Sequence, residues 1–519
     1  MRTPTRRKSN KAQNSVVRSL PAPVGGWNAR DSLADMDPRD ARKLVNWFPT
    51  TTDCELRGGQ TDYATSITGL VETLAVYNKL DGTSEMFAVD SNDVWDVSSS
   101  GVASAQSTTV TNGRWQYLNF GDGTNEYLVM VNGVDAPLYY NGTTWTVITG
   151  VSSPALTGVT LTSLVHVNEY KGRLIFVEKD TLSFWYLAAQ AAGGALTEFP
   201  LDSLANRGGY LMWSATWSFD SGDGPDDAAV FITSEGEVIV YRGTDPSTAA
   251  NWVLAGVYFI GKPLGRRSFV KMAGDLVVIT QDGAFPLSAS LQSSTIDNTV
   301  ALSNKIKNDF NVAARDYGAN FGWEAINYPL RSAMIFNIPL EEDGMHSQYV
   351  MNTITGAWCE FDSWDAECFA EYNDEIYYGL TTEVRKAWTG SSDDGANIIA
   401  LGKTAFNYFG NTSQQKRFTM FRPMIEINGS LSFLTGMDVD FSNEALTGLA
   451  TSSGVTGDVW DTGLWDTAVW SGGSEIVREW RSPSNNVGYC ASVGVQTETA
   501  NIEIKWIAND YVFEHGGVL

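Results

Sequence analysis

Short apolar runs separated by turn residues dominate the chain from about Val71 to Phe441. Runs such as LVETLAVYN, SEMFAVDS and DVWDVSS have the length and composition of strands, and Gly, Asn and Asp stand between them. The segment DGTS, between Leu80 and Glu85, has the composition of a hairpin turn. The pattern predicts many short antiparallel strands, and therefore a mainly β fold with few short helices.

A longer repeat lies within this pattern, because a turn, one Trp and a strand recur at Trp145, Trp252 and Trp358. The two spacings are 107 and 106 residues. Since a four-stranded propeller blade takes about 40 to 50 residues, each interval has room for two blades. We therefore expect a β-propeller-like body of repeated antiparallel sheets, with an array of β-sandwiches as the alternative.

The segment from Pro21 to Gly59 has a different pattern and predicts a short helix. Asp37 followed by Pro38 is a helix-start signal, because Asp can accept hydrogen bonds from free amide groups and Pro at the first helical position loses no bonded amide. The apolar positions that follow recur at roughly helical spacing and end before Pro49: Ala41, Leu44, Val45 and Phe48. We expect this helix to bury one apolar stripe.

A second helix is predicted in SNKIKNDFNVAARD, residues 303–316. Ser303 is in a position to cap it, and one face is apolar, with Ile306, Phe310 and Ala313 or Ala314. A single helix between strands is either a packing element or an interface element between subunits, and both alternatives stay open.

The last eighty residues contain the repeat GDVWDTGLWDTAVW, with Trp460, Trp465 and Trp470 at a period of five. That period fits neither a helix face nor a strand face, so we expect irregular loops held by a cluster of buried indoles. An exposed aromatic platform for sugar is the alternative. The chain thus divides into a basic N-terminal arm (1–20), an N-terminal docking segment with a short helix (21–70), a β-propeller-like body (71–441) and a Trp-rich C-terminal β region (442–519).

The charge is strongly acidic, with 60 Asp and Glu against 35 Lys and Arg and a formal net charge of −25. Phosphate binding depends on clustered Lys and Arg, so this balance argues against a surface that holds nucleic acid and permits one along which nucleic acid passes. The first eighteen residues differ, because they carry six basic residues and no acid: Arg2, Arg6, Arg7, Lys8, Lys11 and Arg18. Such an arm is either a solvated terminus or a docking element.

The four cysteines are few and scattered, which is typical of free thiols in a reducing compartment: Cys54, Cys359, Cys368 and Cys490. A disulfide between Cys359 and Cys368 is the alternative. The basic start is followed by polar residues, so no signal peptide is predicted, and no apolar run is long enough to predict a membrane span.

Motifs that carry chemistry are weak in this chain. Gly256–Lys262 has the spacing of a phosphate-binding loop, but Pro263 replaces the required Ser or Thr. The three histidines are isolated, and the acids of DSGDGPDD miss the spacing of a calcium loop. SSDDGANI weakly resembles the Asp-box turn of sialidases. We therefore predict no catalytic, cofactor-binding or metal-binding residue, and no enzyme.

The opening segment resembles a known family. GGWNARDSLADMDPRDARKLVNWFP followed by ELRGG is similar to the amino-terminal signature of tail nozzle or tail-hub proteins of short-tailed bacteriophages, the tail tubular protein B group. The matching positions are Asn46, Trp47, Phe48, Pro49 and the turn Leu56–Gly59, and the end EHGGVL is similar to the glycine-rich close of such proteins. The middle of the chain agrees only in its β-rich pattern.

The resemblance implies a structural virion protein that is assembled in the bacterial cytoplasm and resides in the tail. It implies a homo-oligomeric, hexameric ring below the portal-adaptor protein, which continues the channel for DNA ejection, helps to retain packaged DNA and has tail fibre or needle proteins as further partners. DNA would pass without specific binding, and no cofactor is implied. The residues expected to serve assembly or packing are Trp27, Asn28, Leu44, Val45, Trp47 and Phe48. The alternative hypothesis is a carbohydrate-binding or carbohydrate-degrading propeller protein.

Overall fold

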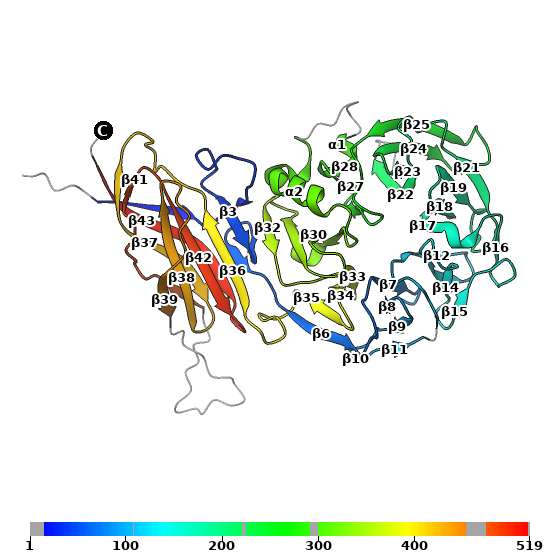
Figure 1. The fold of residues 1–519 in the computed structure, drawn as a ribbon, viewed down its shortest axis with the longest axis horizontal. Coiled ribbons are helices and arrows are strands. Elements are labelled where there is room, and N and C mark those ends of the chain that lie inside the picture. The colour runs from blue at the N-terminus through cyan, green and yellow to red at the C-terminus, as the bar shows by residue number, and fades with distance from the viewer. Residues whose placement is uncertain (1–14, 107, 221–224, 291–298, 453–473, 517–519) are drawn as a thin grey trace, which may run out of the picture. The chain divides into compact units, whose positions relative to one another are not determined.

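The computed structural model describes residues 15–106, 108–220, 225–290, 299–452 and 474–516. The chain divides into two compact units (Figure 1). Unit 1 holds Met1–Arg57, Ala357–Cys359 and Ser391–Leu519, and unit 2 holds Gly58–Gly356 and Glu360–Gly390. In sequence, unit 2 is therefore an insertion into unit 1.

Unit 2 is a β-propeller, and its described part holds seven sheets of three or more strands that follow one another in the chain. The first four sheets are β7 (Thr73–Asn78), β8 (Ser84–Val89), β9 (Val94–Asp96) and β11 (Ser104–Ala105); β12 (Gln116–Gly121), β13 (Glu126–Val131), β14 (Leu138–Tyr140) and β15 (Trp145–Val147); β17 (Leu164–Tyr170), β18 (Arg173–Glu178), β19 (Ser183–Tyr186) and β21 (Thr197–Pro200); and β22 (Leu211–Asp220), β23 (Pro225–Thr233), β24 (Glu237–Gly243) and β25 (Trp252–Phe259).

The remaining sheets of unit 2 follow the same antiparallel plan. They are β26 (Phe269–Met272), β27 (Asp275–Thr280) and β28 (Gly283–Pro286); β29 (Glu324–Tyr328), β30 (Ala333–Pro339) and β31 (His346–Asn352); and β33 (Cys368–Tyr372), β34 (Glu375–Gly379), β35 (Val384–Ala387), β6 (Gln60–Thr65) and β10 (Gly101–Val102). A short parallel pair joins β16 (Leu156–Thr157) to β20 (Gly194–Ala195).

The sheets of unit 2 form a closed ring (Figure 1). Each sheet contacts the next one in chain order, through the pairs β7–β12, β12–β17, β17–β22, β22–β27, β26–β29 and β29–β33, and β33 contacts β7. The last sheet is completed by β6, which comes from the start of unit 2 and pairs antiparallel with β35 near its end. The first and last parts of the propeller are thus joined by backbone hydrogen bonds.

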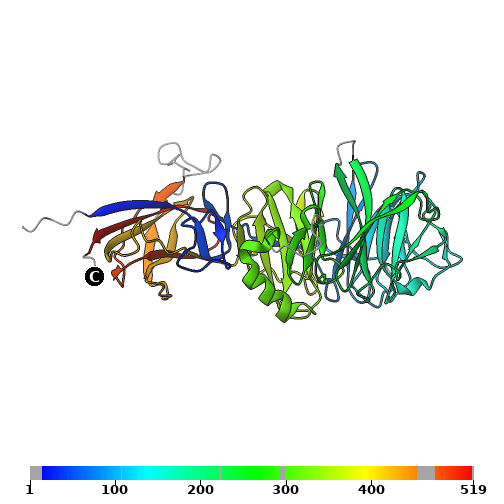
Figure 2. The same cartoon turned by 90° about the horizontal axis from the view of Figure 1, so that it is seen from above.

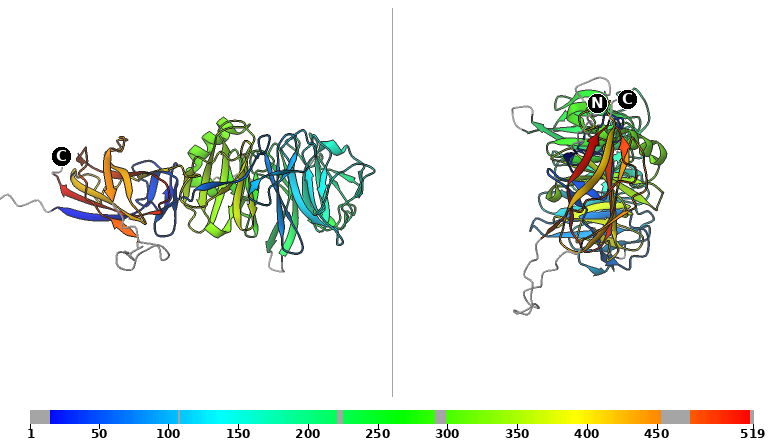
Figure 3. Two further views of the ribbon diagram at one scale, coloured as in Figure 1. Left: turned by 90° about the horizontal axis from the view of Figure 1, so that it is seen from below. Right: turned by 90° about the vertical axis from the view of Figure 1, so that its left-hand side faces the viewer.

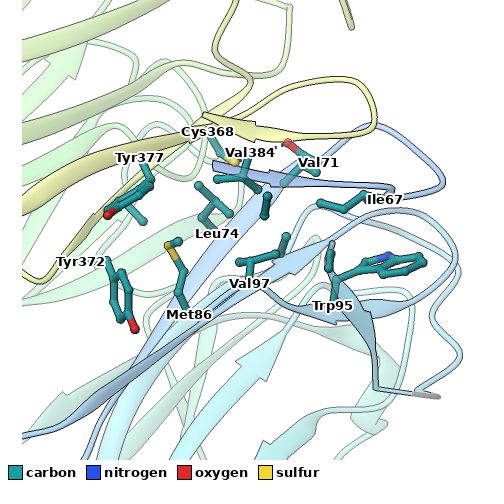
Figure 4. Packing of buried hydrophobic residues seen from close by; sticks show 14 of the residues in the cluster. Ile67, Val71, Leu74, Met86, Trp95, Val97, Cys368, Tyr372, Tyr377 and Val384 are labelled. Carbon is teal, nitrogen blue, oxygen red and sulfur yellow. Dashed lines mark hydrogen bonds between the residues drawn. The ribbon is translucent and has the colours of Figure 1, made fainter. Parts of the chain in front are cut away.

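Both faces of a propeller sheet are buried, because each sheet packs between two others (Figure 2). In β8, Met86 and Ala88 belong to the core shared with β33–β35, whereas Phe87 and Val89 belong to the core shared with β13 and β14. Successive side chains of a strand point to opposite faces, so a strand buried on both faces reads as a continuous apolar run. Figure 4 shows the first of these cores, where Leu74, Met86 and Val384 meet.

The tryptophan spacing has a structural origin in this arrangement. Trp145 begins β15 and Trp252 begins β25, and two sheets lie between them in the chain, β17–β21 and β22–β25. Trp358 begins β32 (Trp358–Phe361), and the interval from Trp252 again contains two sheets, β26–β28 and β29–β31. The prediction of two blades per interval, and of a propeller-like body, is confirmed.

Helices are short and few among the described residues: η1 (Leu161–Ser163), α1 (Leu287–Ser290), η2 (Leu302–Ile306), α2 (Lys307–Tyr317) and η3 (Pro329–Arg331). The helix predicted over 303–316 is confirmed as η2 and α2, and it buries Ile306, Phe310, Ala313 and Ala314 as expected. Ser303 is not its cap. The Ser303 hydroxyl instead accepts a hydrogen bond from the Ala284 amide at 3.0 Å, so it fixes β28 against η2.

Unit 1 contains two sheets in which strands from both ends of the chain pair (Figure 3). One sheet holds β1 (Val16–Pro21), β4 (Trp47–Pro49), β5 (Cys54–Leu56), β37 (Lys416–Ile427), β40 (Glu475–Val477), β41 (Val487–Gly488) and β43 (Ile504–His515). The other has, within unit 1, the strands β2 (Gly26–Trp27), β3 (Asp40–Val45), β36 (Ile398–Thr404), β42 (Ala491–Thr499), β38 (Leu431–Val439) and β39 (Gly448–Ser452).

This division differs from the four parts expected from the sequence. Strands β36, β37 and β38 lie inside the range 71–441 but pair within unit 1, whereas residues 58–70 belong to unit 2. The basic arm expected over 1–20 extends into β1, where Val16 pairs with Phe513 and Leu20 with Asn509. Both units consist of antiparallel strands, so the apolar pattern alone does not mark the boundary between them.

The helix predicted from Asp37 to Phe48 is wrong, because the segment forms β3 and β4. The Asp37 carboxylate does accept a hydrogen bond from a backbone amide, that of Arg39 at 2.8 Å, but in a tight turn before a strand. A register shift between Ala41 and Lys43 and a left-handed Asn46 (φ 56°) then change the face to which side chains point. A strand that is bulged and then kinked thus reproduces the apolar spacing of a helix.

The four cysteines are free and buried, as expected. Burial raises the pKa of Cys54, of Cys368 and of Cys490, the last to about 11, so the thiol is the stable form of these three side chains near neutral pH. Among the described residues, no helix is long and apolar enough to cross a membrane.

The ring closure of unit 2 predicts a strong effect of a charge on β6. Ala64 is fully buried in the core that β6 shares with β7 and β8, whereas Thr61 on the same strand is exposed. Ala64→Asp should lower the free energy of unfolding by about 3 kcal/mol, because it places a carboxylate in an apolar core. Thermal unfolding followed by circular dichroism measures the effect. Thr61→Asp is the control, and equal melting temperatures of the two variants would contradict the closure.

Candidate functional site

The segment that resembles tail proteins ends in a buried polar cluster in unit 1. The guanidinium of Arg57, of which 1% is exposed, donates two hydrogen bonds to the carboxylate of Asp393, from Nη1 to Oδ1 at 2.9 Å and from Nη2 to Oδ2 at 2.7 Å. Arg57 Nε donates to Asn46 Oδ1 at 2.8 Å, and Asn46 Nδ2 donates to the Ile399 carbonyl at 2.8 Å. Asn tolerates the left-handed conformation that position 46 requires.

The side chains that follow Asn46 pack in the core of unit 1. Trp47 is fully buried, and its ring lies 5.8 Å from that of Trp506 in β43. A side chain at Gly402 would meet Trp506 at 2.5 Å, so only glycine leaves room for this ring. The other predicted packing residues of the segment are buried as well, namely Leu44, Val45 and Phe48.

Trp27 and Asn28 hold the start of the same segment. Both are buried, and Trp27 pairs with Ala41 in the short parallel contact of β2 with β3. Asn28 Nδ2 donates to Asp40 at 2.7 Å and to Asp31 at 2.8 Å, while its Oδ1 accepts from the amides of Arg30 and Asp31. Asn28 therefore fixes the loop that leads into β3.

The cluster lies where the chain leaves unit 1 and where it returns. Arg57 is the last residue of unit 1 before the propeller, and Asp393 follows the propeller by three residues. Within unit 2, the amide of Gly59 donates to the Gly390 carbonyl at 3.1 Å and the amide of Thr389 to the Gly59 carbonyl at 3.0 Å. In each unit, hydrogen bonds thus hold the outgoing and the returning segment of the chain close to each other.

A second candidate site is a cavity of about 340 Å³ in unit 2, which we call the face cavity. Its walls come from segments that lead into the first strands of four blades: Asn112, Arg114 and Gln116 before or in β12; Tyr210 and Met212 around the start of β22; Gly265, Arg266 and Arg267 before β26; and Gly318–Trp323 before β29, with Asn132 after β13. Pockets where several blades meet are a common place for ligands in propeller and barrel folds.

Two arginines of the face cavity are fixed by groups that do not line it, Arg114 by carboxylates and Arg267 mainly by carbonyls and a hydroxyl. Arg114 Nε contacts Glu72 at 2.5 Å, and its Nη2 contacts Glu342 at 2.8 Å and Asp343 at 3.1 Å. Arg267 donates to the carbonyls of Glu72 and Trp115, both at 2.9 Å, and to the Thr73 hydroxyl at 2.6 Å.

The aromatic ring of Phe321 lies against both of these guanidinium groups. The Cζ atoms of Arg114 and Arg267 are 4.3 and 5.1 Å from its centroid. The Phe321 amide donates to Glu342 at 2.8 Å, which fixes the loop that carries the ring. The arginines and the ring therefore form one preorganised wall.

A buried carboxyl and an imidazole lie behind the cavity wall. His346 Nε2 and Glu367 Oε2 are 3.7 Å apart, and a side chain at the wall residue Gly322 would meet His346 Nε2 at 2.9 Å. Burial, helped by the nearby Asp343 carboxylate, raises the pKa of Glu367 to about 8, and burial lowers the pKa of His346. Near pH 7 the two groups therefore face each other in neutral form.

The sequence identified the packing residues of the N-terminal segment, Asn28 among them, but it did not predict the ion pair of Arg57 with Asp393. Asp393 lies in the turn that resembled an Asp-box, and its structural role is to pair with Arg57. No role was predicted for Arg266 and Arg267, which follow the segment with phosphate-loop spacing. The sequence feature that could have identified them is a pair of adjacent arginines before a strand in an acidic chain. The predicted Trp460, Trp465 and Trp470 cluster lies outside the described residues.

Comparison with known proteins adds no family. No family model matches the chain, and no curated protein matches it. Solved structures of low similarity include a streptogramin B lyase (TM-score 0.38, 13% identity, 63% of this chain and 96% of that chain) and the BBS1 N-terminal region in complex with ARL6 (0.39, 11%, 65% and 99%). YCF48 bound to a D1 peptide also matches (0.27, 10%, 68% and 96%).

The buried ion pair predicts a large effect of Arg57→Met on stability. The substitution leaves the carboxylate of Asp393 and the side chain of Asn46 without this partner, and breaking a buried pair costs about 3–5 kcal/mol. Urea unfolding of the full chain measures the change. Arg39→Met is the control, because Arg39 pairs with Asp37 on the exposed surface, where water and salt screen the pair and it contributes little to stability. Similar losses in the two variants would contradict a role for the cluster.

The raised pKa of Glu367 predicts that stability depends on pH. Between about pH 6.5 and 8 the folded protein keeps a proton on Glu367 that the unfolded chain has released, so stability falls as pH rises through this window. An unperturbed His346 is mostly neutral there in the unfolded chain and adds little to the slope. Glu367→Gln should remove a slope of roughly 1 kcal/mol per pH unit. The exposed Glu341→Gln should not, and an unchanged slope in Glu367→Gln would refute the assignment.

Proposed function

We propose that this protein is a structural subunit of the tail of a short-tailed bacteriophage, a nozzle or hub protein without catalytic activity. One observation carries the proposal. The segment that resembles tail proteins contributes β5 to one sheet of unit 1, where Glu55 and Cys54 pair with Lys505 and Trp506 of β43, and β43 runs on into the similar chain end at Glu514 and His515.

The matching residues are also the ones on which unit 1 depends. Trp47 packs on Trp506 of β43, and Asn46 holds Arg57. This burial is expected if the matching residues serve only to fold unit 1. It is equally expected if they also give unit 1 the shape that assembly requires. The second explanation is favoured by the exposed apolar side chains of unit 1, which include Val17, Leu449, Ile476, Trp480 and Val487.

Ring assembly has a suitable edge in unit 1. Strand β39 is the last strand of its sheet among the described residues, and Leu449 on it is 57% exposed. Exposed apolar edge strands are typical places for pairing with another chain. In a cyclic homo-oligomer the same edge of every copy would contact a different surface of its neighbour. We propose a hexamer below the portal-adaptor protein, with tail fibre or needle proteins as further partners.

The acidic composition fits a channel for DNA. Six copies at −25 each carry a formal charge of roughly −150, and an acidic lumen repels DNA enough to keep it from adhering. The proposed place of the protein is therefore the virion tail, after assembly in the bacterial cytoplasm. A carbohydrate-directed propeller protein is the alternative, and the face cavity is the observation that favours it.

The native mass tests the proposal. Light scattering of the purified full chain should give a mass near six times 56.6 kDa. Leu449→Asp should weaken the oligomer if β39 is its edge, because it places a charge in an apolar contact. Leu80→Asp in unit 2, where Leu80 is 91% exposed in a turn, is the matched control. A monomer across the micromolar range in the unchanged chain would contradict the ring.

A further inference from the structure

The face cavity has an unusual charge for this chain. Its lining includes three arginines, Arg114, Arg266 and Arg267, and no Asp or Glu. The chain as a whole carries 60 acidic and 35 basic residues. Arg114 pairs with Glu72, Glu342 and Asp343, and Arg267 lies 3.5 Å from Glu324, but none of these acids lines the cavity. The charged side chains of the lining itself are therefore all cationic.

Arg266 differs from the two other arginines in its partners. Its Nη1 donates to the Met212 carbonyl at 2.6 Å, which fixes the side chain, but no carboxylate of the described residues lies within ion-pair distance. Burial lowers the pKa of Arg266, which reflects the cost of a partly dehydrated cation. Both hydrogen bonds that Arg266 makes to described residues leave from Nη1, so Nε and Nη2 can donate to a bound group.

A guanidinium with two free donor nitrogens matches a planar or tetrahedral oxyanion. Arg recognises carboxylate and phosphate through paired hydrogen bonds, and each charge-assisted bond is stronger than a neutral one. A bound anion would compensate the charge of Arg266, which pairs with no carboxylate in the part of the chain that the structure describes.

The remaining lining combines amide groups with aromatic rings. Gln116 makes no side-chain hydrogen bond to another described residue, and Asn320 uses only its Nδ2, toward the Pro339 carbonyl at 3.1 Å. Phe321, Tyr210 and Trp323 supply apolar surface beside them. Amides that bond hydroxyls next to flat apolar rings suit a sugar, whose ring has a polar rim and apolar faces.

We propose that the face cavity binds an anionic sugar unit, with its negative group on Arg266, its hydroxyls on Gln116 and Asn320, and an apolar face toward Phe321. The volume of about 340 Å³ accommodates roughly one or two sugar rings and excludes a nucleic-acid duplex. Arg114 and Arg267 contact the Phe321 ring, and their carboxylate partners leave Arg266 as the uncompensated charge of the site. This inference goes beyond the proposed tail role and does not depend on a ring.

Calorimetric titration of the full chain tests the inference with four probes: glucuronic acid, glucose 6-phosphate, glucose and inorganic phosphate. We expect one or both anionic sugars to bind, and their relative affinity identifies whether the group is a carboxylate or a phosphate. Glucose should bind at least tenfold more weakly than the better anionic sugar. Equal binding of glucose would overturn the role of charge, and equal binding of inorganic phosphate would overturn the role of the sugar.

Variants locate the site. Arg266→Met should weaken binding at least about tenfold, as expected for the loss of a charge-assisted contact. Gln116→Ala should weaken it less and should leave the fold intact, since its side-chain amide bonds no other described residue. The exposed Arg331→Met is the matched control. No binding of either anionic sugar at millimolar concentration, or unchanged affinity in both cavity variants, would overturn the proposal.

Discussion

The ion pair between Arg57 and Asp393 lies at the two points where the chain leaves unit 1 and returns to it. More than three hundred residues of propeller are inserted between these side chains. An insertion of that length is compatible with a stable host only if its ends stay close, and a buried bidentate pair supplies that constraint on the side of unit 1. Backbone hydrogen bonds between Gly59 and Gly390 supply it on the side of the propeller.

The propeller itself follows from burial on two faces. Strands such as β8 and β18 send alternate side chains into different cores, and for that reason their sequences lack the alternation of a half-exposed strand. The sequence therefore predicted the fold class, and the period of about 107 residues predicted two blades per interval. The closing strand β6 was not predicted, because it lies outside the repeat and pairs with a strand more than three hundred residues away.

The wrong prediction of a helix in the N-terminal segment also has its cause in structure that is not local in the sequence. Helical spacing from Ala41 to Phe48 arises from a register shift and one left-handed residue, Asn46, which local propensity does not reveal. Arg57, Asp393 and the arginines of the face cavity were missed for another reason. Polar side chains that meet only in the folded chain have no local spacing, so the sequence gives them no motif.

The account of function joins a unit made from the two chain ends with a propeller inserted between them. The first unit holds the resemblance to tail proteins, and the second holds a cationic cavity in an acidic chain. Its central claim is that the purified protein forms a ring around a channel. Negative-stain electron microscopy of the full chain tests this claim most directly. Closed rings with an open centre and sixfold symmetry are expected, and a field of separate single subunits would contradict it.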